Sequence, residues 1–138
     1  MAEGILRSRW MELGRNDLHV ASTGIHAQEN QPAASLAVEV CQENGIDISH
    51  HLSSPLNGRD LKSSDIIFVM EAVQRDYITL FFPQVNDRTF LLAAWPDKPG
   101  RKSTVADPIG GTLKDYRRAF ETIALHIDRL LPQLTDMF

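Results

Sequence analysis

Apolar side chains recur along this chain with two different periods, which predict helices alternating with strands. Residues 1–14 and 112–134 carry apolar residues every three or four positions, the spacing of one helix face. Residues 65–70 form a continuous apolar run, typical of a strand covered on both faces. The predicted order is helix, strand, helix, strand, helix, strand, helix, over residues 1–14, 18–22, 32–45, 65–70, 71–82, 89–95 and 112–134.

Proline and glycine mark the ends of these elements. Pro32 opens the second predicted helix, Gly45 follows its end, and Pro83 closes the third. Residues 46–60 have no clear period and are predicted to be irregular, with Leu52 and Leu56 reaching the core. Residues 96–111 form a long loop, and long loops in compact domains are often functional.

The alternation predicts an α/β protein with three αβα layers around a small parallel sheet. Ligands of such sheets bind at the carboxyl ends of the strands, where loops enter helices. Because the chain begins directly with a helix, the same alternation leads us to expect a further strand before it.

Composition restricts the class of protein. The 138 residues are 43% apolar and 23% charged, which predicts one globular domain over residues 1–138. The net charge of −4 gives no reason to expect nucleic acid or a membrane as a partner. The chain shows no signal peptide, its apolar runs are too short to span a bilayer, and its single cysteine fits a reducing cytoplasm.

The clearest candidate for chemistry is Asp107, in the stretch "ADPIGG" of the long loop. Pro108 restricts Asp107 to an extended backbone, and Gly110 and Gly111 allow a tight turn close to a ligand. A carboxyl group held on such a turn could act as a general acid or base. An Asp-Pro turn that only precedes a helix is the alternative.

Other polar residues have a functional and a structural interpretation. His50 and Ser22 could orient a neighbouring loop, but they could equally be a surface histidine and a strand-end cap. The pair His50 and His51 lacks a carboxylate at metal spacing, so we predict no metal site and no cofactor. Cys41 lies within a predicted helix and is expected to be a small buried side chain, not a nucleophile.

Five stretches in the right order resemble the low-molecular-weight protein tyrosine phosphatases along nearly the whole chain. "MAEGILR" resembles the start of the family's first helix, and "VASTG" its "SAGT"-type turn. "NGIDISHHLSSPL" is similar to "G-I-D-x-S-H-x-S-R-x-L", "SDIIFVME" to "ADLILVMD", and "DPIGG" to the general-acid loop "D-P-Y-G-G". The "SSPL" detail also resembles the bacterial arginine-phosphatase branch.

The resemblance implies hydrolysis of phosphomonoesters through a phosphocysteine, without a metal. It makes Asp107 the general acid and makes Ser22 and His50 supports of the phosphate-binding loop. Gln28, Pro108 and Ile109 would line the substrate entrance. Ile109 replaces the aromatic residue usual in the family, which weakens the case for stacking on an aryl substrate.

The resemblance also identifies what these residues lack. The family's Cys-x5-Arg loop would stand immediately before Met1, and Asp47 stands six residues after Cys41, where the arginine would be needed. We therefore expect the chain, as given, to be truncated and inactive. In the family fold the missing strand lies between residues 18–22 and 65–70. Three arrangements would fill this gap: upstream residues, direct pairing of the two neighbouring strands, or a homodimer through the exposed sheet edge.

Three functions remain open at this stage. The first is a phosphatase acting on a phosphorylated protein side chain or a small phosphomonoester. The second is a non-catalytic relative that binds or regulates a partner. An arsenate reductase of the same fold is disfavoured, because that reaction needs more than one cysteine.

Overall fold

A computed structural model describes residues 1–100 and 103–138. The chain divides into two compact units, which are treated separately. We call Met1–Pro55 with Asp107–Phe138 the helical unit, and Leu56–Ala106 the sheet unit. The predicted loop 96–111 includes Arg101 and Lys102, which lie outside the described residues. A single domain over residues 1–138 stays a prediction.

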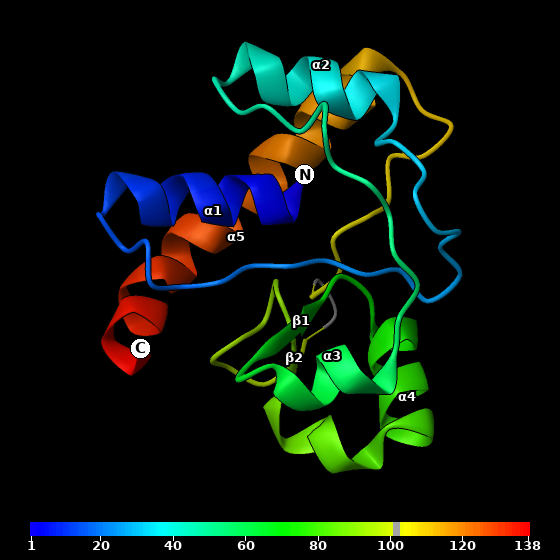
Figure 1. Cartoon of the computed structure of the whole chain (residues 1–138), viewed down its shortest axis with the longest axis vertical. Helices are drawn as coiled ribbons and strands as arrows, with labels where there is room; N and C mark the ends of the chain where they lie inside the picture. Colours follow the sequence, from blue (N-terminus) through cyan, green and yellow to red (C-terminus); the bar gives the residue numbers. More distant parts are fainter. Residues whose placement is uncertain (101–102) are drawn as a thin grey trace. The chain divides into compact units, whose positions relative to one another are not determined.

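The helical unit is built on α5 (Leu113–Met137), the longest helix among the described residues. Both α1 (Ala2–Glu12) and α2 (Ser35–Glu43) pack on it, as Figure 1 shows. The buried face of α5 consists of Tyr116, Ala119, Phe120, Ile123, Ile127, Leu130 and Leu134. The amphipathic spacing therefore predicted this helix correctly, and the buried residues follow the same spacing of three or four positions.

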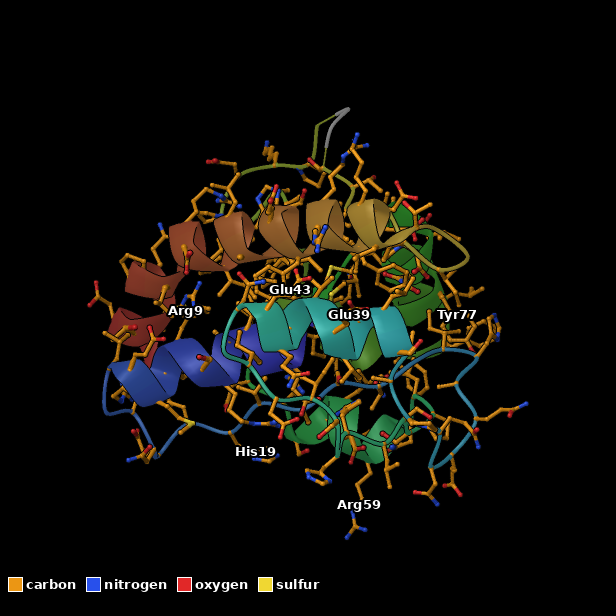
Figure 2. The ribbon with its side chains drawn as sticks, turned by 90° about the horizontal axis from the view of Figure 1, so that it is seen from above. Arg9, His19, Glu39, Glu43, Arg59 and Tyr77 are labelled. Carbon is orange, nitrogen blue, oxygen red and sulfur yellow. The ribbon has the colours of Figure 1, made fainter. Side chains whose placement is uncertain are left out.

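Two ion pairs join α5 to its neighbours. The Nε atom of Arg9 on α1 lies 2.7 Å from Oδ1 of Asp128. On α2, Glu43 Oε1 lies 2.6 Å from Nη2 of Arg117. Figure 2 shows Arg9 and Glu43 on the sides of their helices that face α5. Because both pairs are largely exposed, they orient the helices more than they stabilise them.

Glycine allows the first turn of α1 to approach the segment that follows α2. A Cβ atom at Gly4 would lie 2.7 Å from Cγ2 of Ile48 and 3.2 Å from Cγ2 of Ile46. Both isoleucines are buried, as is Ile5 beside the glycine. A side chain at position 4 would therefore force Ile48 to move.

The sheet unit contains two short parallel strands, β1 (Ile67–Val69) and β2 (Thr89–Leu91). Helix α4 (Ala72–Phe81) packs on both strands, and the 3-10 helix η1 (Pro83–Arg88) leads from it into β2 (Figure 1). The short α3 (Gly58–Ser63) contacts η1. The core of this unit consists of Leu61, Val69, Ile78, Val85, Leu91 and Ala94.

Local hydrogen bonds start the helices of the sheet unit. A capping box joins Glu71 and Gln74 at the start of α4. Asn57 caps α3 by accepting a hydrogen bond from the Asp60 amide at 2.9 Å. The sequence analysis missed α3 and η1 because both are too short to show an apolar period.

The predicted strand over residues 18–22 is wrong. This segment has no regular secondary structure, since no strand in the described part of the chain pairs with it. The Val20 carbonyl instead accepts a hydrogen bond from Arg7 at 3.2 Å. The structure thus shows helices with a two-stranded parallel sheet, where three strands were predicted.

Three further predictions need correction. The second helix begins at Ser35 instead of Pro32, because Pro32 forms an isolated antiparallel bridge with Leu52. Leu52 is 52% exposed and does not reach the core, whereas Leu56 packs against the core of the sheet unit as expected. Strand β2 ends at Leu91 because the chain turns there, with the Ala94 amide donating to the Leu91 carbonyl.

No helix in the described ranges 1–100 and 103–138 has the length and hydropathy needed to cross a bilayer.

The contact at Gly4 gives the first testable prediction. Gly4→Ala should lower the free energy of unfolding by about 1–2 kcal/mol, because overpacking costs more than helix propensity returns. Urea unfolding followed by circular dichroism measures this change. Gly100→Ala is the control, since a Cβ there meets nothing within 4 Å. Equal stability of both variants would contradict the close contact.

Candidate functional site

The helical unit contains a cavity of about 330 Å³ beside the first turn of α1. Four segments form its wall: the start of α1, the end of the extended segment at Ser22, the loop before α2 at Ala33, and the turn after α2. Its lining includes Met1, Glu3, Gly4, Arg7, Ser22, Ala33, Asp47, Ile48, His50, His51 and Leu52. The structure therefore brings together Ser22 and His50, two of the residues named from the sequence.

The Glu3 carboxylate is the centre of the polar groups on this wall. Its Oε2 accepts a hydrogen bond from the Ser22 hydroxyl at 2.5 Å. The same oxygen lies 3.6 Å from Nδ1 of His51, and Oε1 pairs with the Arg7 guanidinium. The Glu3 side chain is only 11% exposed, so these groups replace most of the water around its charge.

Two opposing effects set the pKa of Glu3. Burial is the largest single influence and raises the pKa. Hydrogen bonds from Ser22 and Arg7, with the charges of Arg7 and His51, together outweigh burial and lower it below its ordinary value. Glu3 is therefore ionised at neutral pH despite its burial.

A turn after α2 presents the two histidines to the cavity. Asp47 Oδ1 accepts hydrogen bonds from the Ser49 amide at 2.8 Å and from the Ser49 hydroxyl at 2.6 Å. These bonds, the hydroxyl first, hold the pKa of Asp47 below its ordinary value. The His51 amide closes the turn by donating to the Ile48 carbonyl at 3.1 Å.

Asp107 lies on a separate exposed turn just before α5. Its Oδ1 accepts a hydrogen bond from the Ile109 amide at 3.0 Å, and Gly110 follows with φ of 76°. The Ile109 side chain is 77% exposed. Neither Asp107, Pro108 nor Ile109 belongs to the cavity lining.

Gln28 lies on the exposed loop that precedes α2. Its carbonyl oxygen accepts a hydrogen bond from the Ser53 hydroxyl, and the Ser53 amide donates to the Gln31 carbonyl at 2.8 Å. These bonds fix the loop backbone but leave the Gln28 side chain at the surface. Gln28 does not line the cavity.

Cys41 is fully buried in α2, as the sequence predicted. Burial raises the pKa of its thiol, which opposes formation of a nucleophilic thiolate.

The sequence analysis missed Glu3 and His51 as members of this cluster. Glu3 stands in the first turn of a predicted helix, where acidic residues are common because the helix N-terminus favours negative charge. The short stretch "MAEG" was noted only as a family resemblance, and that stretch was the one signal that could have identified Glu3.

Comparison with known proteins assigns the family. Residues 1–137 match the family described as "Low molecular weight phosphotyrosine protein phosphatase". The chain belongs to this family, as the sequence resemblance indicated.

Individual relatives agree with this assignment. A protein-arginine-phosphatase of Geobacillus stearothermophilus is 32% identical over 117 residues, covering 85% of this chain and 77% of the relative. A probable low-molecular-weight protein-tyrosine-phosphatase, EpsP of Ralstonia nicotianae, is 31% identical over 134 residues. The match covers 97% of this chain and 86% of the relative. The crystal structure of the low-molecular-weight protein tyrosine phosphatase from T. tengcongensis matches with a TM-score of 0.87 and 34% identity. The match covers 96% of this chain and 88% of the crystallised chain.

The Glu3 cluster gives the second prediction. Glu3→Gln should lower the free energy of unfolding at pH 7 by about 1–2 kcal/mol, because hydrogen bonds to a charged group are lost. Since the folded pKa of Glu3 lies below its unfolded value, this contribution is full above the unfolded pKa. It disappears as pH falls through the folded pKa.

Urea unfolding of the wild type and the variant at pH 7 and pH 3 measures the difference. Glu12→Gln is the matched control on the same helix, since Glu12 is 64% exposed and lies 3.9 Å from Arg9. A surface pair of this kind is worth about 0–1 kcal/mol. If Glu3→Gln lost the same free energy of unfolding at pH 3 as at pH 7, the ionised Glu3 carboxylate would not be the source of the stability.

Proposed function

We propose that this chain carries the scaffold and the general acid of a phosphomonoester hydrolase, with Asp107 as the acid. Membership of the phosphatase family supports this proposal most strongly. The Asp107 turn supports it further, because an exposed carboxyl group beside Pro108 and two glycines is free to meet a substrate.

In the proposed reaction a cysteine thiolate attacks phosphorus, and the bond to the leaving oxygen breaks. Asp107 gives its proton to that oxygen, and its carboxylate then takes a proton from the water that hydrolyses the phosphocysteine. Ser22 and His50 are proposed to support the loop that holds the thiolate. None of the 138 residues supplies a Cys-x5-Arg loop, so nucleophile and arginine have to come from elsewhere.

The proposed substrate is a phosphorylated protein side chain or a small phosphomonoester. The relatives include proteins named as tyrosine phosphatases and as arginine phosphatases. Ile109, with Gln28 and Pro108, is proposed to line the entrance. An aliphatic side chain cannot stack on an aryl ring as an aromatic one does, so Ile109 does not favour phosphotyrosine over phosphoarginine.

A non-catalytic binding or regulatory role is the second candidate. The observation that favours it is the absence of a Cys-x5-Arg sequence from these residues. The scaffold would then serve as an interaction surface. For either function we propose a cytoplasmic location, supported by the single buried cysteine.

A homodimer through the sheet edge is also proposed. Among the described residues β1 has β2 as its only strand partner, and a free strand edge can pair with another chain. Sedimentation velocity over a range of protein concentrations tests this, and a monomer throughout would contradict it.

The activity test uses para-nitrophenyl phosphate and two proteins. The 138-residue chain should show no turnover, because it lacks a nucleophile. A second protein carries the family's N-terminal strand and Cys-x5-Arg loop fused before Met1, and it should hydrolyse the substrate. In that fusion Asp107→Asn should lower kcat by about 10²–10⁴-fold, the usual contribution of general acid catalysis.

Asp136→Asn in the same fusion is the control, since it removes an exposed carboxylate at the far end of α5. The proposed inactivity would be contradicted if the 138-residue chain alone hydrolysed the substrate and its Asp107→Asn variant did not. A folded fusion without turnover would favour the binding role.

A further inference from the structure

The Glu3 carboxylate joins α1 to two segments that are far away in the sequence. Ser22 comes from the extended segment before the first loop, His51 from the turn after α2, and Arg7 from the next turn of α1 itself. Neither Ser22 nor His51 belongs to a helix or strand, although the His51 amide donates to the Ile48 carbonyl.

The extended segment is held by side chains of α1. Arg7 Nη2 donates to the Val20 carbonyl at 3.2 Å and also pairs with Glu3. Ser22, two residues further along, donates to Glu3 at 2.5 Å. The two ionised side chains therefore hold the end of this segment against the helix.

Glu3 is itself held in a fixed place. Gly4 packs against Ile48 so closely that a Cβ atom would lie 2.7 Å from Cγ2. Ile5, on the other side of that glycine, is fully buried. The backbone beside Glu3 is therefore closely packed, and Ser22 and His51 meet the carboxylate next to a buried part of α1.

From this arrangement we propose that Glu3 is a positioning residue, whose carboxylate holds Ser22 and His51 on the cavity wall and releases them on protonation. The proposed function enters at one point only, the role of Ser22 as a support of the phosphate-binding loop. It adds to that function a pH-dependent control of the site by a residue that does not touch the substrate.

The charges around Glu3 determine the direction of this dependence. Arg7 and His51 contact the carboxylate, while Asp47, His50 and the Met1 ammonium line the same cavity. A neutral carboxyl group keeps one acceptor for Ser22 but loses its attraction for Arg7 and His51. The pKa of Glu3 lies below its ordinary value, so release is expected only in acid, below the range where an exposed glutamate titrates.

Nuclear magnetic resonance on the 138-residue chain tests the proposal without any substrate. The Ser22 amide, the His51 ring and the Glu3 side-chain carbonyl carbon are followed from pH 3 to pH 7. In the wild type the Ser22 and His51 signals should show an acid transition at the midpoint of the Glu3 carboxyl group. In Glu3→Gln both should lack the transition at that midpoint, and the Ser22 amide should lie near its acid position at pH 7.

Three further variants sharpen the test. Glu12→Gln, which removes the same charge from the other end of α1, should leave both signals unchanged. Glu3→Asp should restore the acid transition in part, because it keeps the charge on a shorter side chain. Ser22→Ala should shift the Glu3 midpoint upward, because a hydrogen bond that favours the ionised form is gone. This last variant keeps the test decisive if Glu3→Gln fails to fold.

An unchanged acid transition at Ser22 and His51 in folded Glu3→Gln would overturn the proposal, as would an unmoved Glu3 midpoint in Ser22→Ala. Both results are independent of phosphatase activity. Failure of the fusion to hydrolyse substrate would therefore count against the proposed function and leave the positioning role standing.

Discussion

Burial of the apolar face of α5 is the interaction on which the helical unit depends. Each large aliphatic side chain on that face, such as Ile127 or Leu130, contributes about 1.5–3 kcal/mol when it leaves water. The same face provides the surface against which α1 and α2 pack. The position of the first turn of α1, and so of Glu3, follows from this packing.

Polar contacts then fix what packing leaves undetermined. Residues 18–22 and 47–52 lack a helix or strand, so their backbone groups need other partners. Arg7 donates to the Val20 carbonyl and Asp47 accepts from the Ser49 amide, while Glu3 binds the Ser22 hydroxyl. A cavity wall held in this way depends on charge state, whereas a wall built from a sheet ladder would not.

The Asp107 turn and the cavity wall are supported by different kinds of contact. Asp107 accepts one hydrogen bond from the Ile109 amide and is exposed to solvent. Directly after it, a capping box of Thr112 and Asp115 starts α5. Asp107 is therefore joined to the longest described helix through a short turn, and its side chain remains accessible.

The sequence by itself determined the four longer helices to within a few residues, the apolar period of α5, the burial of Cys41 and the family. Each depends on local periodicity or on motifs whose residues stand close together. Only the tertiary structure decided that residues 18–22 would not form a strand, because a strand needs a hydrogen-bonded neighbour that local propensity cannot reveal. It alone also brought Glu3 to Ser22 and His51, since contacts between distant segments follow from how helices pack.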